Sequence, residues 1–186
     1  MSGGRDTLLD RCVQALLRRG IGDLSLREIA AEAGTSHRML IYHFGSRDGL
    51  LAAVVGRVEA DQRAALESLP GDPLEASRAF WERLTDPALA PAERLFFEIY
   101  AQALRGRDWT TSFRESVIDA WEESVAALYQ RLGASPETAR AHVRLGLAVT
   151  RGLLMDLLLT DDREVVAEAM ELFGSMFAAS VVRVNT

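Results

Sequence analysis

The chain has 186 residues, of which 48% are hydrophobic and 26% are charged, and this composition is typical of a folded globular protein and excludes a disordered one. Its formal net charge of −6 excludes a protein that binds nucleic acid over its whole surface. The charge is unevenly distributed, however, because residues 1–50 hold seven arginines and six acidic residues, whereas residues 51–186 hold fourteen and twenty-one. Only the amino-terminal part is therefore electrostatically suited to phosphate.

The sequence gives no sign of a membrane or secreted protein. Its longest apolar stretch, residues 145–159, is interrupted by Arg151 and Asp156 and is shorter than the roughly 20 residues of a membrane span. Residues 1–20 lack the pattern of a secretion signal, and a lone cysteine, Cys12, forms no disulfide framework and is expected in a buried helix. These features predict a cytoplasmic protein.

Three short helices are predicted in the first fifty residues. Apolar residues at helical spacing predict a helix over residues 6–19, and Gly20 ends it in a left-handed conformation. Ser25 and Glu28 form a predicted capping box, so a second helix begins directly after Ser25. Gly34 ends this helix, and Ser36 is placed to cap a third that runs to residue 44. Such a short connection predicts two helices that cross at a tight turn.

Six further helices follow, and they are expected over residues 47–69, 73–84, 91–105, 111–132, 136–159 and 162–182. Asp86-Pro87 and Ser135-Pro136 are typical of a cap followed by proline in the first turn. Asp161 with Glu164 predicts a second capping box. No alternating pattern of a strand is present, so the predicted fold class is all-α with about nine helices.

The third helix and its flanks have the residue types of a DNA-reading helix. Such a helix needs small or polar residues in its first turn, because that turn enters the major groove and its free amides attract phosphate. Leu40 and Phe44 are expected to anchor the helix, Arg38 to contact guanine or phosphate, and Arg47 to contact phosphate. The full set of predicted DNA-binding residues is Arg27, Thr35, Ser36, His37, Arg38, Met39, Tyr42, His43 and Arg47.

This segment resembles the TetR family of transcriptional regulators, in a form similar to actinobacterial sequences. The family pattern is approximately (S/T)-x-x-x-I-A-x-x-A-G for the second helix, followed by V-S-x-G-x-L-Y-x-H-F-x-x-K-x-x-L. The matching residues here are Ser25, Ile29, Ala30, Ala33, Gly34, Ser36, Leu40, His43, Phe44 and Leu50. The chain departs from the pattern at Arg38, Ile41 and Arg47, where the family usually has glycine, tyrosine and lysine. The operator of another member therefore cannot be transferred to this chain.

The resemblance implies a helix-turn-helix DNA-binding domain over residues 1–50 and a helical domain for effector binding and dimerisation over residues 51–186. Aromatic residues crowd the middle of the second domain and are expected to line an apolar cavity, although plain core packing is the alternative for each of them. The predicted ligand-binding residues are Trp81, Phe97, Tyr100, Trp109, Phe113, Trp121 and His142. Further polar candidates are Glu98, Gln102, Arg144 and Arg151. The arginine pair suits a carboxylate ligand or an ordinary ion pair.

The last two helices are more apolar than one core contact requires. Val166, Met170 and Phe173 begin one stripe, and Val165, Ala169 and Leu172 begin a second beside it. Large apolar faces are a liability in a monomer, so residues 136–159 and 162–182 are predicted to form a homodimer interface, as the family also implies. A two-fold dimer places two recognition helices about 34–36 Å apart on a pseudo-palindromic operator.

The sequence thus predicts a ligand-responsive DNA-binding regulator, a repressor released from its operator by a small, largely apolar effector. The alternative is a regulator controlled by a protein partner, without a small-molecule pocket. An enzyme is not expected, because the chain has no nucleotide-binding, zinc-protease or hydrolase motif. No cofactor is expected either, and no metal site, since His142 has no second histidine or cysteine three or four residues away.

Overall fold

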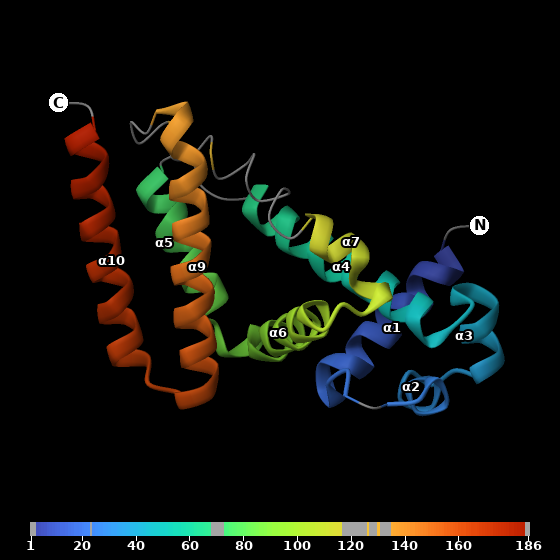
Figure 1. Ribbon diagram of the computed structural model, residues 1–186. Coiled ribbons are helices and arrows are strands. Elements are labelled where there is room, and N and C mark those ends of the chain that lie inside the picture. The colour runs from blue at the N-terminus through green and yellow to red at the C-terminus, as the bar shows by residue number, and fades with distance from the viewer. Residues whose placement is uncertain are drawn as a thin grey trace. The chain divides into compact units, whose positions relative to one another are not determined.

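The computed structural model describes residues 3–22, 24–67, 73–116 and 135–184, together with residues 126 and 130. Across this part of the chain it contains nine α-helices, two short 3-10 helices and no strand (Figure 1). The predicted all-α fold is therefore confirmed. The helices are α1 (Gly3–Arg19), α2 (Leu26–Glu32), α3 (His37–Phe44), α4 (Arg47–Glu67), α5 (Pro73–Leu84), η1 (Pro87–Leu89), α6 (Ala90–Leu104), η2 (Asp108–Thr110), α7 (Thr111–Ser116), α9 (Pro136–Thr160) and α10 (Arg163–Val184).

The observed helices follow the predicted ones within a few residues, and the Asp86-Pro87 cap is confirmed, since the Asp86 carboxylate accepts the N–H of Ala88 at 2.8 Å. Most of the predicted helix 111–132 lies outside the described residues after Ser116. The chain forms two compact units, of which the first comprises residues 1–62 and 91–116 and the second residues 63–90 and 117–186. Helices α6 and α7 thus pack within the amino-terminal unit, and a functional division at residue 50 stays a prediction.

The core of the first unit is built from the apolar stripes of its short helices. Leu16, Ile29 and Leu40 are fully buried, one from each of α1, α2 and α3. Cys12 is buried among them, as the sequence predicted, and burial raises the pKa of its thiol to about 11. The thiol therefore stays protonated at neutral pH and acts as a small apolar core group.

The capping box that begins α2 is present as predicted. The Ser25 hydroxyl accepts the N–H of Glu28 at 3.3 Å, and the Glu28 carboxylate accepts the N–H of Ser25 at 2.7 Å. Hydrogen bonds from the Ser25 hydroxyl and then from its N–H lower the pKa of Glu28, because they stabilise the charged carboxylate. Two amides that the helix leaves without partners are thereby satisfied.

In the second unit, α9 and α10 form an antiparallel pair side by side (Figure 1). Val143 and Leu154 of α9 and Val166 of α10 are buried there. His142 packs against the Phe177 ring with centroids 5.0 Å apart, so α9 and α10 also meet through an aromatic contact.

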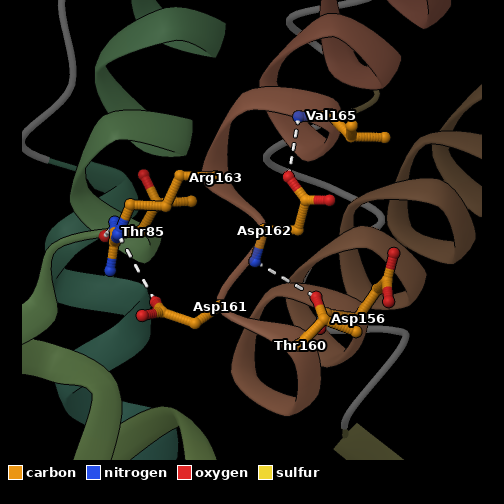
Figure 2. A network of polar contacts seen from close by, with 7 residues as sticks. All are labelled: Thr85, Asp156, Thr160, Asp161, Asp162, Arg163 and Val165. Atoms are coloured by element: carbon orange, nitrogen blue, oxygen red, sulfur yellow. Dashed lines mark hydrogen bonds and ion pairs between the residues drawn. The ribbon is translucent and has the colours of Figure 1, made fainter.

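The corner between α9 and α10 corrects one prediction. The predicted capping box of Asp161 with Glu164 is wrong, because Asp161 adopts a left-handed φ of 57° and α10 begins at Arg163, one residue later than predicted. Asp162 is the cap instead, and its carboxylate accepts the N–H of Val165 at 3.2 Å (Figure 2). The guanidinium of Arg163 donates to the carbonyl of Thr85 at 2.9 Å, which ties the corner to the end of α5.

Candidate nucleic-acid interface

The turn between α2 and α3 is as tight as the sequence predicted. Gly34 has a φ of 61°, a left-handed conformation that glycine adopts without steric cost. The N–H of Thr35 donates back to the carbonyl of Ala30 at 2.9 Å, so the chain reverses directly after α2. The Ser36 hydroxyl then accepts the N–H of Met39 at 3.2 Å and begins α3, which confirms the predicted cap.

Helix α3 has one buried and one exposed side. Leu40 and Phe44 are buried and anchor the helix in the unit, as predicted. On the other side Tyr42 is 79% exposed, and Met39 and Ile41 are also among the exposed large apolar side chains. The Tyr42 ring contacts the His43 ring edge-on with centroids 4.9 Å apart and is otherwise largely exposed, so this side presents aromatic and apolar surface to solvent.

Arg11 of α1 holds the turn between α2 and α3. Its Nε donates to the carbonyl of Ala33 at 2.8 Å, and its Nη2 donates to the carbonyl of Gly34. A Cβ at Gly34 would lie 2.9 Å from that Nη2, so glycine also leaves room for the guanidinium. The sequence did not indicate this role, because a backbone carbonyl acceptor leaves no trace in residue identity.

Arg47, at the start of α4, is bound inside the unit. Its Nε donates to the carbonyl of Leu24 at 2.7 Å and its Nη2 to the carbonyl of Gly22 at 3.0 Å. The sequence predicted a phosphate contact for this residue, and that contact stays a prediction. It requires the guanidinium either to bind phosphate and these carbonyls together or to leave the carbonyls. The structure adds a role in fixing the segment between α1 and α2.

The approach of α4 to the end of α3 depends on Gly49. A Cβ at this position would lie 2.1 Å from the carbonyl oxygen of Phe44, much closer than any real Cβ contact. The Ser46 hydroxyl accepts the N–H of Gly49 at 3.0 Å and so caps α4. Sequence reasoning missed the requirement for glycine here, because the crowding atom belongs to the backbone of the preceding helix.

The predicted DNA-binding residues lie on α2, on the turn, on α3 and at the start of α4, within one compact unit. Arg27, His37 and Arg38 are exposed, whereas Thr35 and His43 are half-buried. Arg5 of α1 lies over the Phe44 ring with its guanidinium carbon 5.2 Å from the ring centroid, which adds a positive charge beside α3. The arrangement offers cationic and hydrogen-bonding groups around a helix N-terminus, as phosphate and base edges require.

The predicted ligand-binding residues do not all lie in one unit. Phe97, Tyr100, Trp109 and Phe113 belong to the first, Trp81 and His142 belong to the second, and Trp121 lies outside the described residues. Within the first unit, the Phe113 ring contacts the rings of Phe96 and Tyr100 at centroid distances of 5.7 and 5.9 Å. Phe113 and Trp109 are buried, while Phe97 and Tyr100 are half-buried. A ligand site made by the whole set stays a prediction.

Other features of the described residues bear on alternative functions. A pocket of about 280 Å³ lies between α1 and α2, and none of the predicted aromatic residues lines it. Its lining residues are Thr7, Asp10, Arg11, Gln14, Arg18, Glu32 and Ala33. No group of three or more histidine, cysteine, aspartate or glutamate side chains in the described ranges is arranged to hold a metal ion. Among the helices that the structure describes, none has the length and apolar character needed to cross a membrane.

Comparison with known proteins gives this arrangement a family. Residues 8–54 match the family model of bacterial regulatory proteins of the tetR family. No curated protein matches the chain. Among solved structures, a transcriptional regulator from Rhodococcus sp. Rha1 superposes with a TM-score of 0.80 at 20% identity, covering 97% of this chain and 96% of that one, and shares the fold.

Two further structures are more similar in sequence. A member of the TetR family from Streptomyces coelicolor has a TM-score of 0.69 at 27% identity, over 92% of this chain and 96% of that one. The multidrug binding protein EbrR, complexed with imidazole, has a TM-score of 0.68 at 28% identity, over 94% of this chain and 90% of that one. Residues 8–54 are thus identified as an amino-terminal domain of the tetR family of bacterial regulatory proteins, and the fold is shared over nearly the whole length with solved transcriptional regulators.

Proposed function

We propose that the chain is a ligand-responsive repressor that reads a pseudo-palindromic operator through α3. The observation that carries this proposal is the two-sided character of α3, which buries Leu40 and Phe44 and exposes its polar first turn within the TetR-type domain. A helix held by two core anchors presents its first turn rigidly to the major groove.

The exposed side chains suggest how bases are read. Arg38 reaches either the O6 and N7 atoms of guanine or a phosphate, and His37 beside it offers a further donor. Ile41 is exposed where the family usually has tyrosine, so it presents methyl groups suited to the thymine methyl in place of a hydroxyl. We therefore expect an operator that differs from those of members with tyrosine at this position.

Dimerisation supplies the second reading helix. Large apolar side chains are exposed on both α9 and α10, namely Leu145, Met155, Leu159, Val165, Leu172 and Met176. Covering them with the same surface of a second copy removes them from water and gives a closed two-fold interface. A four-helix interface between two copies of α9 and α10 is the proposed arrangement.

The proposed effector is small and largely apolar. Support comes from EbrR, which is described as a multidrug binding protein and was solved with imidazole and with proflavin. In this chain the half-buried Phe97 and Tyr100 offer aromatic surface of the kind that flat apolar molecules contact. The effector must bind the DNA-free protein more tightly than the DNA-bound protein. A difference of about 1–3 kcal/mol between these two binding free energies is enough to lower operator affinity 5–150-fold.

The direct test is a titration of the purified protein onto labelled DNA from upstream of its own coding sequence, at several salt concentrations. We expect one tight site and a steep salt dependence. Relative to wild type, Arg38→Ala should lose more affinity for that site than for scrambled DNA of the same length. Weak binding of equal strength to every fragment contradicts the proposal. Release of bound DNA by a protein from the source cell, with no response to any apolar compound, supports control by a protein partner instead.

A further inference from the structure

The carboxyl end of α1 leaves one buried amide without a helical acceptor. Gly20 follows the helix with a φ of 75°, and its N–H donates to the carbonyl of Leu16 at 2.7 Å. This is the simple left-handed helix ending, in which the next amide does not return to the helix as it does in a Schellman motif. The N–H of Ile21 is therefore free of α1, and Ile21 is only 2% exposed.

A carboxylate from a distant part of the sequence accepts this amide. The Oε2 atom of Glu98, on α6, lies 2.5 Å from the backbone N of Ile21, and both residues belong to the first unit. A buried amide without an acceptor is destabilising, and a charged acceptor makes a stronger bond than a neutral one. Glu98 thus provides an acceptor that neither α1 nor solvent supplies.

The packing around this bond is close. A Cβ at Gly20 would lie 2.6 Å from Oε1 of Glu98, so a side chain there would push the carboxylate away from Ile21. A carboxylate at the carboxyl end of a helix is also disfavoured by the helix dipole, which makes an incidental contact a poor explanation. The guanidinium of Arg47 donates to the carbonyls of Gly22 and Leu24, which follow Ile21 in the chain. Its positive charge therefore lies close to this segment and opposes the penalty.

Residues 20–22 and Leu24 are consequently held by two helices at once. Glu98 of α6 accepts an amide of this segment, and Arg47 of α4 donates to its carbonyls. The segment leads directly into Ser25, the cap of α2, so its position sets where α2 begins relative to α1. A displacement here moves α2 and, through the tight turn at Gly34, α3.

We propose that Glu98 is a positioning residue for DNA reading, which fixes the α1–α2 segment on α6 through the N–H of Ile21 so that α3 is presented in its reading orientation. The inference rests on the proposed DNA-binding function. Glu98 lies outside the helix-turn-helix, and the sequence suggested it only as a polar group in a ligand cavity.

The test uses the full-length protein and the variants Glu98→Ala and Glu98→Gln. Affinity is measured for the upstream DNA site and for scrambled DNA, and exchange of the Ile21 amide is followed by nuclear magnetic resonance without DNA. We expect Glu98→Ala to weaken specific binding about tenfold, with unchanged binding to scrambled DNA and an unchanged salt slope, because the phosphate-contacting groups are intact. Glu98→Gln keeps an oxygen acceptor and should restore specific binding to within about threefold of wild type.

Glu115→Ala is the charge-matched control, since Glu115 is exposed on α7 of the same unit. Its DNA affinity and Ile21 exchange should equal those of the wild type. Unchanged Ile21 exchange in Glu98→Ala overturns the inference whatever the DNA result. A parallel fall in specific and scrambled binding also overturns it, because that pattern indicates general loss of folding. Absence of specific binding by the wild type, with faster Ile21 exchange in Glu98→Ala, overturns the proposed function and leaves Glu98 with a purely structural role, which contradicts the inference.

Discussion

The DNA-reading segment, residues 25–50, and the helical pair α9 and α10 are specified in different ways. In the segment, individual groups fix nearly every change of direction: Ser25, Ser36 and Ser46 cap helices, Arg11 binds a turn, and Gly49 permits a close approach. In the helical pair, a polar corner joins two long helices that bury apolar residues such as Val143, Leu154 and Val166, and several large side chains stay exposed.

The difference explains why the sequence of the first region matches a family model and the sequence of the second does not. Placing a reading helix depends on hydrogen bonds and backbone conformations that few residue types supply. An apolar face depends on area and shape, which many combinations of Leu, Val, Met and Phe provide, because the hydrophobic effect is non-directional. The family model accordingly matches residues 8–54, whereas the similarity in structure extends over nearly the whole chain.

The largest effect is expected when Gly49 is replaced with alanine. The new Cβ meets the carbonyl of Phe44, so α3 and α4 must separate, and we expect a loss of about 3 kcal/mol or more in the free energy of unfolding. Chemical denaturation measures it. Gly56→Ala on the same helix is the control, because a Cβ there meets nothing within 4 Å, and it should stabilise by about 0.5–1 kcal/mol. Equal effects of the two substitutions would show that the packing of α3 on α4 is not as tight as described.

A charge on the apolar face of α10 tests the other region. Leu172 is 63% exposed in the single chain, so Leu172→Glu should leave the fold intact but weaken a homodimer about 100-fold, which corresponds to about 2.7 kcal/mol. Sedimentation equilibrium measures the dimer dissociation constant. Leu104→Glu is the matched control, because Leu104 is a similarly exposed leucine on α6. A dimer that tolerates Leu172→Glu but not Leu104→Glu would place the interface on the first unit.

A smaller effect separates stability from DNA contact at the cap of α3. Ser36→Ala removes the acceptor for the N–H of Met39 and should cost about 1 kcal/mol in the free energy of unfolding. Ser36→Asp keeps an acceptor and should retain stability, yet its carboxylate repels phosphate and should lower DNA affinity. Thermal unfolding and DNA titration are measured on the same samples. Wild-type DNA affinity in Ser36→Asp would argue that the first turn of α3 does not approach the backbone of DNA.

The smallest effect is the pH dependence of the Ser25–Glu28 capping box. The pKa of Glu28 is lower in the folded chain than in the unfolded one, so its contribution to stability is fully present above the ordinary carboxyl pKa of about 4.3 and is lost as pH falls through the folded value. The unfolding free energies of wild type and Glu28→Gln should therefore converge as the solution is acidified. A constant difference from pH 7 to pH 3 would show that the carboxylate charge contributes nothing to this helix end.

The sequence predicted the helix boundaries well where capping residues mark them. Ser25, Ser36 and Asp86 cap the helices that they were expected to cap, and the buried positions of Leu40 and Phe44 follow from helical spacing. The prediction was wrong at Asp161, where two adjacent aspartates offered alternative caps and the left-handed conformation of the first left the second to cap α10. Identity alone does not distinguish neighbouring residues of the same type.

By itself, therefore, the sequence determined the all-helical fold, the capped helix-turn-helix and its resemblance to TetR-type readers, because these depend on interactions between residues close together in the chain. Only the tertiary structure showed that Glu98 accepts the amide of Ile21, that Arg47 binds the carbonyls of Gly22 and Leu24, and that Gly49 lies against Phe44. These contacts involve backbone atoms, which every residue shares, and the first two join segments far apart in sequence. Residue identity therefore leaves them undetermined until the chain is folded.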